Sequence, residues 1–176
     1  MTTNSPIKDL EVIEQMKRLF LTKGNVKGYL LFVLSINTGI NLKELLALKI
    51  RDVKNKQYLS IGKHVAIPLS KELRNIVAQV VGNRKQEEPL FINKYGGALD
   101  RTSVFFMFKT ICSELGVQDK YSVVSWRKTF AYHYYQKYKD LSYLQWLFNQ
   151  SRIEDALRFI EVEENMNLRF REGVGL

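Results

Sequence analysis

The sequence predicts a mainly helical α+β domain with a small antiparallel β-hairpin. Apolar residues recur at helical spacing along most of the chain, and one short segment, residues 58–69, is instead rich in β-type residues. The chain has 176 residues, of which 45% are hydrophobic, and this is enough to form one sizeable core. No internal repeat and no linker-like stretch is present, so we expect a single domain over residues 1–176. Its core would lie in residues 6–162, with a C-terminal tail in residues 163–176.

The first half is expected to hold three helices followed by the hairpin. Apolar residues at helical spacing over 7–20 predict the first helix, and the apolar stretch 28–34 predicts the second. The second helix should end at residues 37–39, because Gly39 suits a helix C-cap. Leucines over 42–48 mark a short third helix. Segments 58–61 and 64–69 then predict a hairpin or a small three-stranded sheet.

The second half is expected to be helical. An amphipathic helix over residues 73–80 should close at Gly82 and lead into a charged loop over 83–88. Further helices are predicted over 100–115, 122–138, 141–148 and 153–162, joined by short polar segments. The tail mixes charged and apolar residues, which suits either a frayed end or an arm that docks on a partner.

The charge balance points to a polyanionic partner. Lys and Arg outnumber Asp and Glu by 27 to 18, giving a formal net charge of +9 and a pI near 9.6. Such an excess is typical of proteins that bind nucleic acid or an acidic membrane surface, although a positive charge can also serve solubility alone.

Several classes of protein are disfavoured. The lone Cys112 has no partner for an internal disulfide, and neither a secretory signal nor an apolar run of membrane-spanning length is present. We therefore expect a cytoplasmic protein with no membrane partner. No P-loop, GxGxxG, HExxH or paired-cysteine motif occurs, and His64 and His133 have no companions at ligand spacing, so neither a metal nor a cofactor is expected. For His133 a half-buried place on an aromatic helix face is favoured over a functional role.

One predicted helix start carries residues that could hold phosphates. Arg101, Thr102 and Ser103 open the helix expected over 100–115. Free backbone N–H groups at such a start can bind DNA phosphates, but the same residue types serve as simple helix caps.

The order of several short segments resembles the catalytic domain of tyrosine recombinases, the phage integrase family, from about residue 7 to residue 162. The segment TGINLKELLAL at 38–48 is similar to the family's TG(L/I)R(I/L)xELxxL, and IPLS at 67–70 is similar to the VPLS that ends its hairpin. PLF at 89–91 with the glycines at 96–97, RKTFA at 127–131 and LRFI at 157–160 resemble later blocks in the same order.

The resemblance implies six reaction-centre positions. In the family, two arginines and a lysine hold the scissile phosphate and neutralise its transition-state charge, and a tyrosine attacks phosphorus to give a 3′-phosphotyrosyl link. A histidine and a second His or Trp assist positioning and proton transfer. The resemblance places these positions, in chain order, at Asn41, Lys63, Val124, Arg127, Gln150 and Phe159.

Four of these positions lack the family residue, and this predicts that the protein is not an enzyme. Phe159 has no oxygen to form the covalent intermediate. Loss of the first arginine, at Asn41, should cost a factor on the order of 10² to 10³, and Val124 and Gln150 remove proton-transfer capacity. The open alternative is a different nucleophile among tyrosines close in sequence: Tyr132, Tyr134, Tyr135, Tyr138 and Tyr143.

The remaining cations are the expected DNA contacts. Arg127 matches the second arginine and should bind a phosphate, although it could instead pair with an acidic neighbour. Lys63 at the hairpin tip suits either a phosphate contact or plain solvation. We add Lys128 and the helix start at 101–103 to this set. Lys43 is not offered as a substitute for the lost arginine, because two residues along a helix it should point elsewhere.

The sequence therefore predicts a non-catalytic protein that binds double-stranded DNA, as a regulator or accessory factor of a mobile element, and that is nucleoid-associated when bound. The family's N-terminal clamp domain is expected to be absent, so binding should be weak unless two copies cooperate. The tail could contact another copy or another recombinase. Two alternatives stay open: rewired strand cleavage and joining, and a protein-interaction module that modulates an active recombinase.

Overall fold

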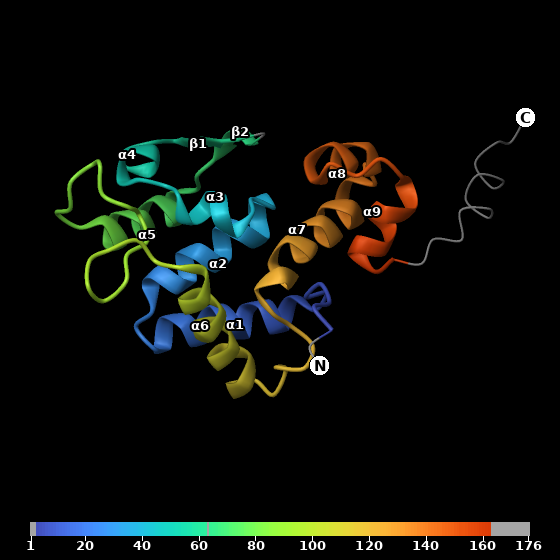
Figure 1. The fold of residues 1–176 in the computed structure, drawn as a ribbon, viewed down its shortest axis with the longest axis horizontal. Helices are drawn as coiled ribbons and strands as arrows, with labels where there is room; N and C mark the ends of the chain where they lie inside the picture. Colours follow the sequence, from blue (N-terminus) through green and yellow to red (C-terminus); the bar gives the residue numbers. More distant parts are fainter. Residues whose placement is uncertain (1–2, 63, 163–176) are drawn as a thin grey trace, which may run out of the picture.

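A computed structural model describes residues 3–62 and 64–162 (Figure 1). Lys63 and the predicted tail, residues 163–176, lie outside the described residues. The helices and strands are α1 (Leu10–Thr22), α2 (Val26–Thr38), α3 (Leu42–Leu46), α4 (Ile50–Val53), β1 (Tyr58–Ile61), β2 (His64–Pro68), α5 (Lys71–Val81), α6 (Arg101–Glu114), α7 (Val123–Tyr138), α8 (Leu141–Phe148) and α9 (Ile153–Ile160). The mainly helical α+β prediction is confirmed.

Helix ends follow the side chains that can satisfy free backbone groups. The Asn25 side chain accepts a hydrogen bond from the Gly28 amide at the start of α2, and Ser70 does the same for Leu73 at the start of α5. At the end of α2, Gly39 takes the left-handed conformation with φ 69°, as its position in the sequence predicts.

The hairpin is confirmed as two antiparallel strands, with Leu59 opposite Ile67 and Tyr58 opposite Pro68. Within the described ranges the sheet has no third strand. Helix α4 was not predicted, because four residues are too few to show a helical period. It forms where the Asp52 carboxylate accepts a hydrogen bond from the Lys49 amide.

The main core surrounds α2, whose residues are buried on nearly all sides. The Phe32 ring lies 5.7 Å from Phe20, 5.8 Å from Phe108 and 5.6 Å from Trp126, measured between ring centroids. Cys112 is part of this core, and burial raises the pKa of its thiol to about 12. A thiol that keeps its proton is a poor nucleophile, so Cys112 acts here as a core residue.

A second, smaller cluster joins the C-terminal half of α7 to α8 and α9. It contains Ala131 and Tyr135 of α7, Leu144 of α8, and Leu157 and Ile160 of α9. Figure 1 shows α8 and α9 at one side of the molecule, reached through α7, with the hairpin and α5 on the other side. Helix α7 therefore belongs to both clusters and connects them.

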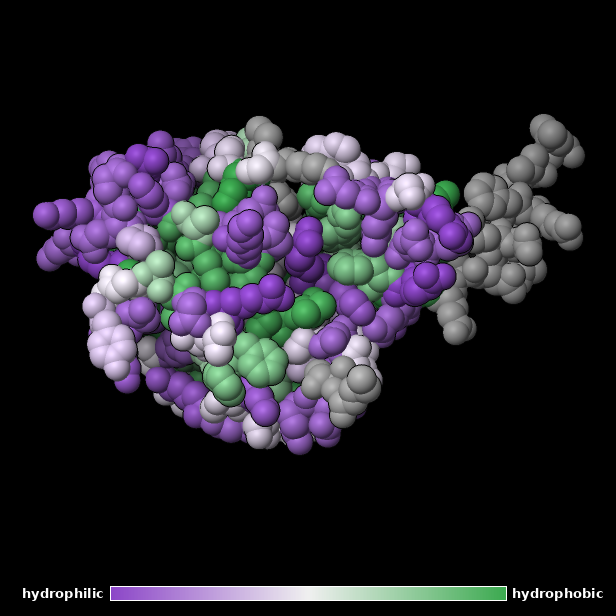
Figure 2. Space-filling model, viewed as in Figure 1, coloured by the Kyte–Doolittle hydropathy of each residue, from purple (hydrophilic) through white to green (hydrophobic). Residues whose placement is uncertain are grey.

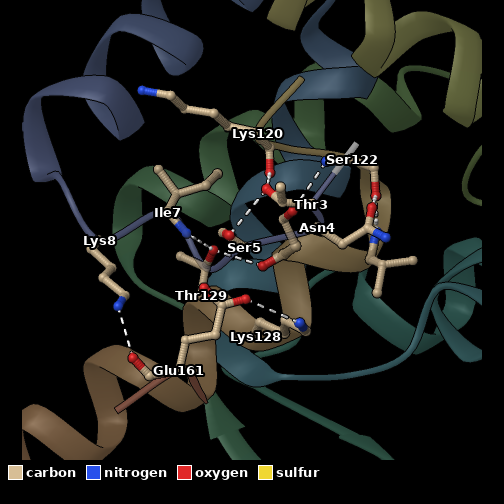
Figure 3. Close-up of polar contacts among 12 residues, drawn as sticks. Thr3, Asn4, Ser5, Ile7, Lys8, Lys120, Ser122, Lys128, Thr129 and Glu161 are labelled. Atoms are coloured by element: carbon tan, nitrogen blue, oxygen red, sulfur yellow. Dashed lines mark hydrogen bonds and ion pairs between the residues drawn. The ribbon is translucent and has the colours of Figure 1, made fainter. Parts of the chain in front are cut away.

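The N-terminal segment before α1 ties these parts together (Figure 3). The Thr3 amide donates to the Asp119 carbonyl at 3.0 Å, and the Ser5 amide donates to the Lys120 carbonyl at 3.1 Å. At the other end of the segment, Lys8 Nζ donates to the Glu161 carbonyl, just past α9, at 2.9 Å. The segment thus reaches from the start of α7 to the end of α9.

Ile7 fixes this segment to α7. Its side chain is fully buried, and its amide donates to Thr129 Oγ1 at 2.9 Å. Its carbonyl lies 2.9 Å from His133 Nε2, so His133 has a structural partner, in agreement with the interpretation favoured from the sequence. None of the described helices is both long and apolar enough to cross a membrane.

We predict that Thr129→Val lowers the free energy of unfolding by about 1–3 kcal/mol, because the buried Ile7 amide loses its acceptor. The matched control is Thr110→Val on the exposed face of α6, where, among the described residues, the hydroxyl bonds only to the Phe106 carbonyl of its own helix. This control should change stability by less than about 0.5 kcal/mol. Urea denaturation measures both, and equal effects would show that the Ile7 contact does not hold the segment.

Candidate functional site

A hollow of about 420 Å³ lies where α2, α3, α6, α7 and α9 meet. Four of the six positions taken from the recombinase resemblance line it, although they are up to 118 residues apart in the chain. The lining residues are Ser35, Asn41, Leu42, Lys43, Arg101, Val123, Val124, Trp126, Arg127 and Phe159. The fold therefore brings together Asn41, Val124, Arg127 and Phe159, as the sequence order implied.

Arg127 is held in place by two contacts, neither of which is to a charged group. Its Nε donates to the Gly39 carbonyl at 2.9 Å, and its guanidinium lies 4.6 Å from the centre of the Phe148 ring. Burial lowers the pKa of Arg127, while the nearby Glu44 carboxylate opposes the shift. An arginine nevertheless keeps its proton at neutral pH. Within residues 3–62 and 64–162 no carboxylate forms an ion pair with it, and its Nη groups have no acceptor.

The charge of the lining is positive. Arg127, Arg101 and Lys43 contribute cations, and no carboxylate is among the lining residues. Lys43 was expected to point to a different helix face from position 41, yet both residues line the hollow. Asn41 is the N-cap of α3, outside the helix proper, so the helical angle between the two positions does not apply.

Asn41 has a local structural role. Its Oδ1 accepts a hydrogen bond from the Glu44 amide at 2.8 Å, and its Nδ2 donates to the Glu44 carboxylate at 2.5 Å. A neutral amide therefore caps α3 at the position where the family places an arginine. The Glu44 carboxylate also approaches the hairpin turn, because a Cβ added at Gly62 would lie 2.6 Å from Glu44 Oε1.

Phe159 and Val124 make this part of the hollow apolar. The Phe159 ring packs on Phe148 with ring centroids 4.9 Å apart, so Phe148 contacts both Phe159 and the Arg127 guanidinium. Val124 is 47% exposed, which is high for a large apolar residue. Gln150 does not line the hollow. Its side-chain oxygen is buried and has no hydrogen-bond partner among the described residues.

Two of the other predicted DNA contacts, Ser103 and Lys128, already have partners within the protein. The Asp100 carboxylate caps α6, accepting hydrogen bonds from the Ser103 amide at 2.8 Å and its hydroxyl at 2.6 Å, and these bonds lower the pKa of Asp100. Capping is therefore the role that the structure supports for Ser103, and phosphate binding by Thr102 and Ser103 stays a prediction. Lys128 Nζ lies 3.4 Å from the Glu161 carboxylate, so it has a partner already.

Similarity to known proteins identifies the family to which the chain belongs. A profile of the phage integrase family matches residues 9–166, so the chain is a member of that family. Among curated proteins it is 28% identical over 166 residues to the probable integrase/recombinase YoeC of Bacillus subtilis strain 168, and the match covers 91% of each chain.

Solved structures show the same fold. XerA recombinase superposes with a TM-score of 0.72 at 15% identity, covering 97% of this chain and 64% of that one. XerH recombinase bound to its difH substrate gives 0.71 at 18% identity, covering 99% and 55%. A λ integrase dimer bound to a COC′ core site gives 0.66 at 16% identity, covering 91% and 49%. The chain thus spans about half to two thirds of the length of these recombinases.

The expectation that the protein is not an enzyme is contradicted by these relatives. The family is one of integrases, and a relative that matches nearly end to end is named as an integrase/recombinase. Phenylalanine at position 159 removes one oxygen from the hollow. That change affects a single position, and it does not determine which reaction the whole protein performs.

We predict that Gly39→Ala destabilises the protein more than Gly24→Ala, by about 1–3 kcal/mol. Both glycines have positive φ, 69° and 67°, so both variants carry the same backbone penalty. A Cβ at Gly39 would also lie 2.5 Å from the Phe130 ring, whereas a Cβ at Gly24 meets no atom within 4 Å. Thermal unfolding compares the two, and equal losses would show that the Phe130 contact is easily relieved.

Proposed function

We propose that this protein binds double-stranded DNA by placing a backbone phosphate in the hollow beside Arg127, and that it acts in DNA recombination of a mobile element. The observation that carries the proposal is the state of Arg127: a fixed cation whose Nη groups are free of acceptors in the described residues. Planar guanidinium groups match phosphate oxygens in a bidentate fashion.

The surroundings of Arg127 support a phosphate in particular. Arg101 and Lys43 line the same hollow, and no carboxylate does. The negative charge of a backbone phosphate would therefore relieve the repulsion among the cations. The net charge of +9 favours approach to DNA over longer distances. A solved Tn1549 integrase structure of the same fold contains transposon right end DNA, and the XerH structure contains its difH substrate.

We further propose that residues 1–176 act as one DNA-binding unit. A role as regulator or accessory factor, contacts through the tail and phosphate binding by Lys63 remain predictions that concern partners or residues outside the described part of the chain. A protein-interaction module without DNA affinity is the alternative that the following experiment separates.

We expect the purified protein to shift duplex DNA in a mobility assay, with affinity that falls steeply as salt rises. If about five phosphates are contacted, the slope of log K against log salt should be about −4 to −5. Arg127→Ala should weaken binding by about 1.5–3 kcal/mol and reduce the slope by about 1, because one charge-assisted phosphate contact is lost.

Arg18→Ala is the matched control, because Arg18 is exposed on α1 and pairs with Glu11 at 2.8 Å, away from the hollow. It should leave affinity within about twofold of wild type, as expected for a surface substitution. Salt-independent affinity, or an Arg127 variant that binds like wild type, would contradict the proposed phosphate contact. Circular dichroism of each variant separates loss of binding from loss of fold.

A second candidate function is DNA strand cleavage and joining, favoured by the integrase/recombinase name of a relative that matches 91% of both chains. In that reaction a protein hydroxyl loses its proton as its oxygen bonds to phosphorus, and the bond between phosphorus and the deoxyribose 5′-oxygen breaks. The 5′-oxygen takes up a proton and leaves as a free hydroxyl, while the phosphate stays linked to the 3′-oxygen and to the protein. Phe159 cannot supply the hydroxyl. Among the described residues, none of the chain's tyrosines lines the hollow, so the attacking group would have to approach from another position.

This candidate predicts a covalent protein–DNA adduct on a nicked suicide substrate, stable to boiling in detergent, whose modified peptide does not contain Phe159. Phe159→Leu should form the same adduct, because the phenyl ring contributes no reacting atom. Absence of an adduct on nicked, linear and supercoiled substrates would remove this candidate and leave DNA binding as the proposed function. Peptide mapping would identify the attacking residue.

A further inference from the structure

The end of α9 is held by two lysines that come from different parts of the chain (Figure 3). Lys8 belongs to the N-terminal strap, residues 3–8, and its Nζ donates to the Glu161 carbonyl at 2.9 Å. Lys128 belongs to α7, and its Nζ lies 3.4 Å from the Glu161 carboxylate. The Glu161 side chain is 36% exposed, and Figure 2 shows mainly hydrophilic residues over α9 at the right of the view. The ion pair therefore lies at the surface of the protein.

Glu161 has a backbone conformation that a glutamate does not favour. Its φ is 53° and its ψ is 45°, in the left-handed region where the side chain of an L-residue crowds the backbone. Glycine is the usual residue at such a helix end, because it has no Cβ. The hydrogen bond from Lys8 and the ion pair with Lys128 stabilise this conformation. Loss of the hydrogen bond would therefore let Glu161 relax and its carboxylate move away from Lys128.

The strap that supplies Lys8 is itself fixed to α7. The Ile7 amide donates to Thr129 Oγ1, and the Ile7 carbonyl lies 2.9 Å from His133 Nε2. Lys8 Nζ also lies 5.2 Å from the centre of the Tyr132 ring. The strap, α7 and the end of α9 thus form one closed set of contacts. Within this set, the strap helps to determine where the carboxylate at the end of α9 is placed.

Lys128 lies next to the hollow beside Arg127. It follows Arg127 on α7, and its Nζ lies 5.8 Å from the centre of the Phe159 ring. Phe159 lines the hollow, so one aromatic ring separates this lysine from the proposed phosphate position. A lysine carries its charge on a flexible four-carbon stem, so it can turn toward a nearby anion. The Glu161 carboxylate therefore neutralises a cation that an anionic ligand could otherwise use.

We propose that the strap and Glu161 form an autoinhibitory contact, which withholds Lys128 from the DNA backbone as long as the end of α9 is held. This inference rests on the DNA binding proposed above and concerns its regulation. A phosphate and the Glu161 carboxylate are both anions, so they compete for the same ammonium group. Because a partly exposed ion pair is weak, the competition lowers affinity by a modest factor and does not block binding. Any change that frees the strap from α7 then raises the affinity for DNA.

The first test removes the competing charge. Glu161→Gln keeps the size of the side chain, and we expect it to raise duplex affinity about three- to fivefold, because Lys128 no longer has to leave a carboxylate. One more cation then contacts phosphate, so the slope of log K against log salt should become steeper by about 0.9. Fluorescence anisotropy with a labelled duplex at several salt concentrations measures both quantities on the full chain.

A second substitution shows whether the gain passes through Lys128. Lys128→Gln alone should leave affinity within about twofold of wild type, because in the wild type this lysine is engaged with Glu161. In the Glu161→Gln background the same substitution should remove the whole gain. The matched control is Glu154→Gln, which makes the same change of net charge on α9 at a carboxylate that pairs with Arg152. This control should stay within about twofold of wild type.

The strap is tested by Lys8→Met, which keeps an unbranched stem but removes the donor to the Glu161 carbonyl. Loss of a cation should by itself weaken DNA binding. The autoinhibitory contact predicts the opposite, a gain of about two- to threefold. Lys120→Met is the control, because Lys120 is exposed and contacts the strap through its backbone carbonyl, and it should leave affinity unchanged or lower it. An equal loss of affinity in both variants would overturn the role of the strap.

The outcomes separate this proposal from the phosphate contact. If Arg127→Ala weakens binding but Glu161→Gln binds like wild type, or keeps its gain when Lys128 is also replaced, only the autoinhibitory contact is overturned. If Arg127→Ala binds like wild type while Glu161→Gln shows the expected gain, only the phosphate contact beside Arg127 is overturned. If neither the wild type nor Glu161→Gln binds duplex, both are overturned. Circular dichroism of each variant checks that the fold is kept.

Discussion

The packing of α7 across α2 is the interaction on which the rest of the structure depends. Helix α2 is apolar almost all round, so it must be covered on every side. Trp126 of α7 covers part of it by contacting Phe32, and it also contacts Phe108 of α6. Trp126 is only 1% exposed, so its ring is enclosed by the core. Arg127 is the next residue along the same helix, so the ring that is locked in the core also sets the direction of the neighbouring cation.

A charged group in such a place needs partners that hold it without neutralising it. The Gly39 carbonyl and the Phe148 ring do this for Arg127, because neither carries a formal charge. The carbonyl is available because α2 ends at a left-handed glycine and leaves its last backbone groups without helical partners. The end of α2, the aromatic packing and the positive charge of the hollow thus depend on a few residues: Gly39, Phe148 and Arg127.

Much of this arrangement could be predicted from the sequence, and the failures have identifiable causes. Helix periods and caps located most elements, and the order of short motifs identified Arg127 and Phe159 as neighbours in space. The contact of Phe148 with Arg127 was missed, because one aromatic residue on a predicted helix gives no indication of what its ring will face. That Lys43 and Asn41 line the same hollow was not predicted, because an N-cap lies outside the helix whose geometry was applied to the pair.

The inference about enzymatic activity failed for a different reason. The prediction rested on the side chains at four motif positions. The match to the integrase family and the near full-length match to an integrase/recombinase rest on most of the chain.

The division of the apolar residues into two clusters has a consequence for cooperativity. Helices α8 and α9 pack mainly on each other and on the end of α7, so this C-terminal unit can open by a local unfolding equilibrium while the main cluster stays folded. The hollow beside Arg127 is lined from both sides of that boundary, by Asn41 and Arg101 on one side and Phe159 on the other. A ligand bound there stabilises only the closed form, so its binding free energy is added to the opening free energy of the C-terminal unit. Amide hydrogen exchange would then slow in α8 and α9 in proportion to ligand concentration, even at positions that the ligand never touches.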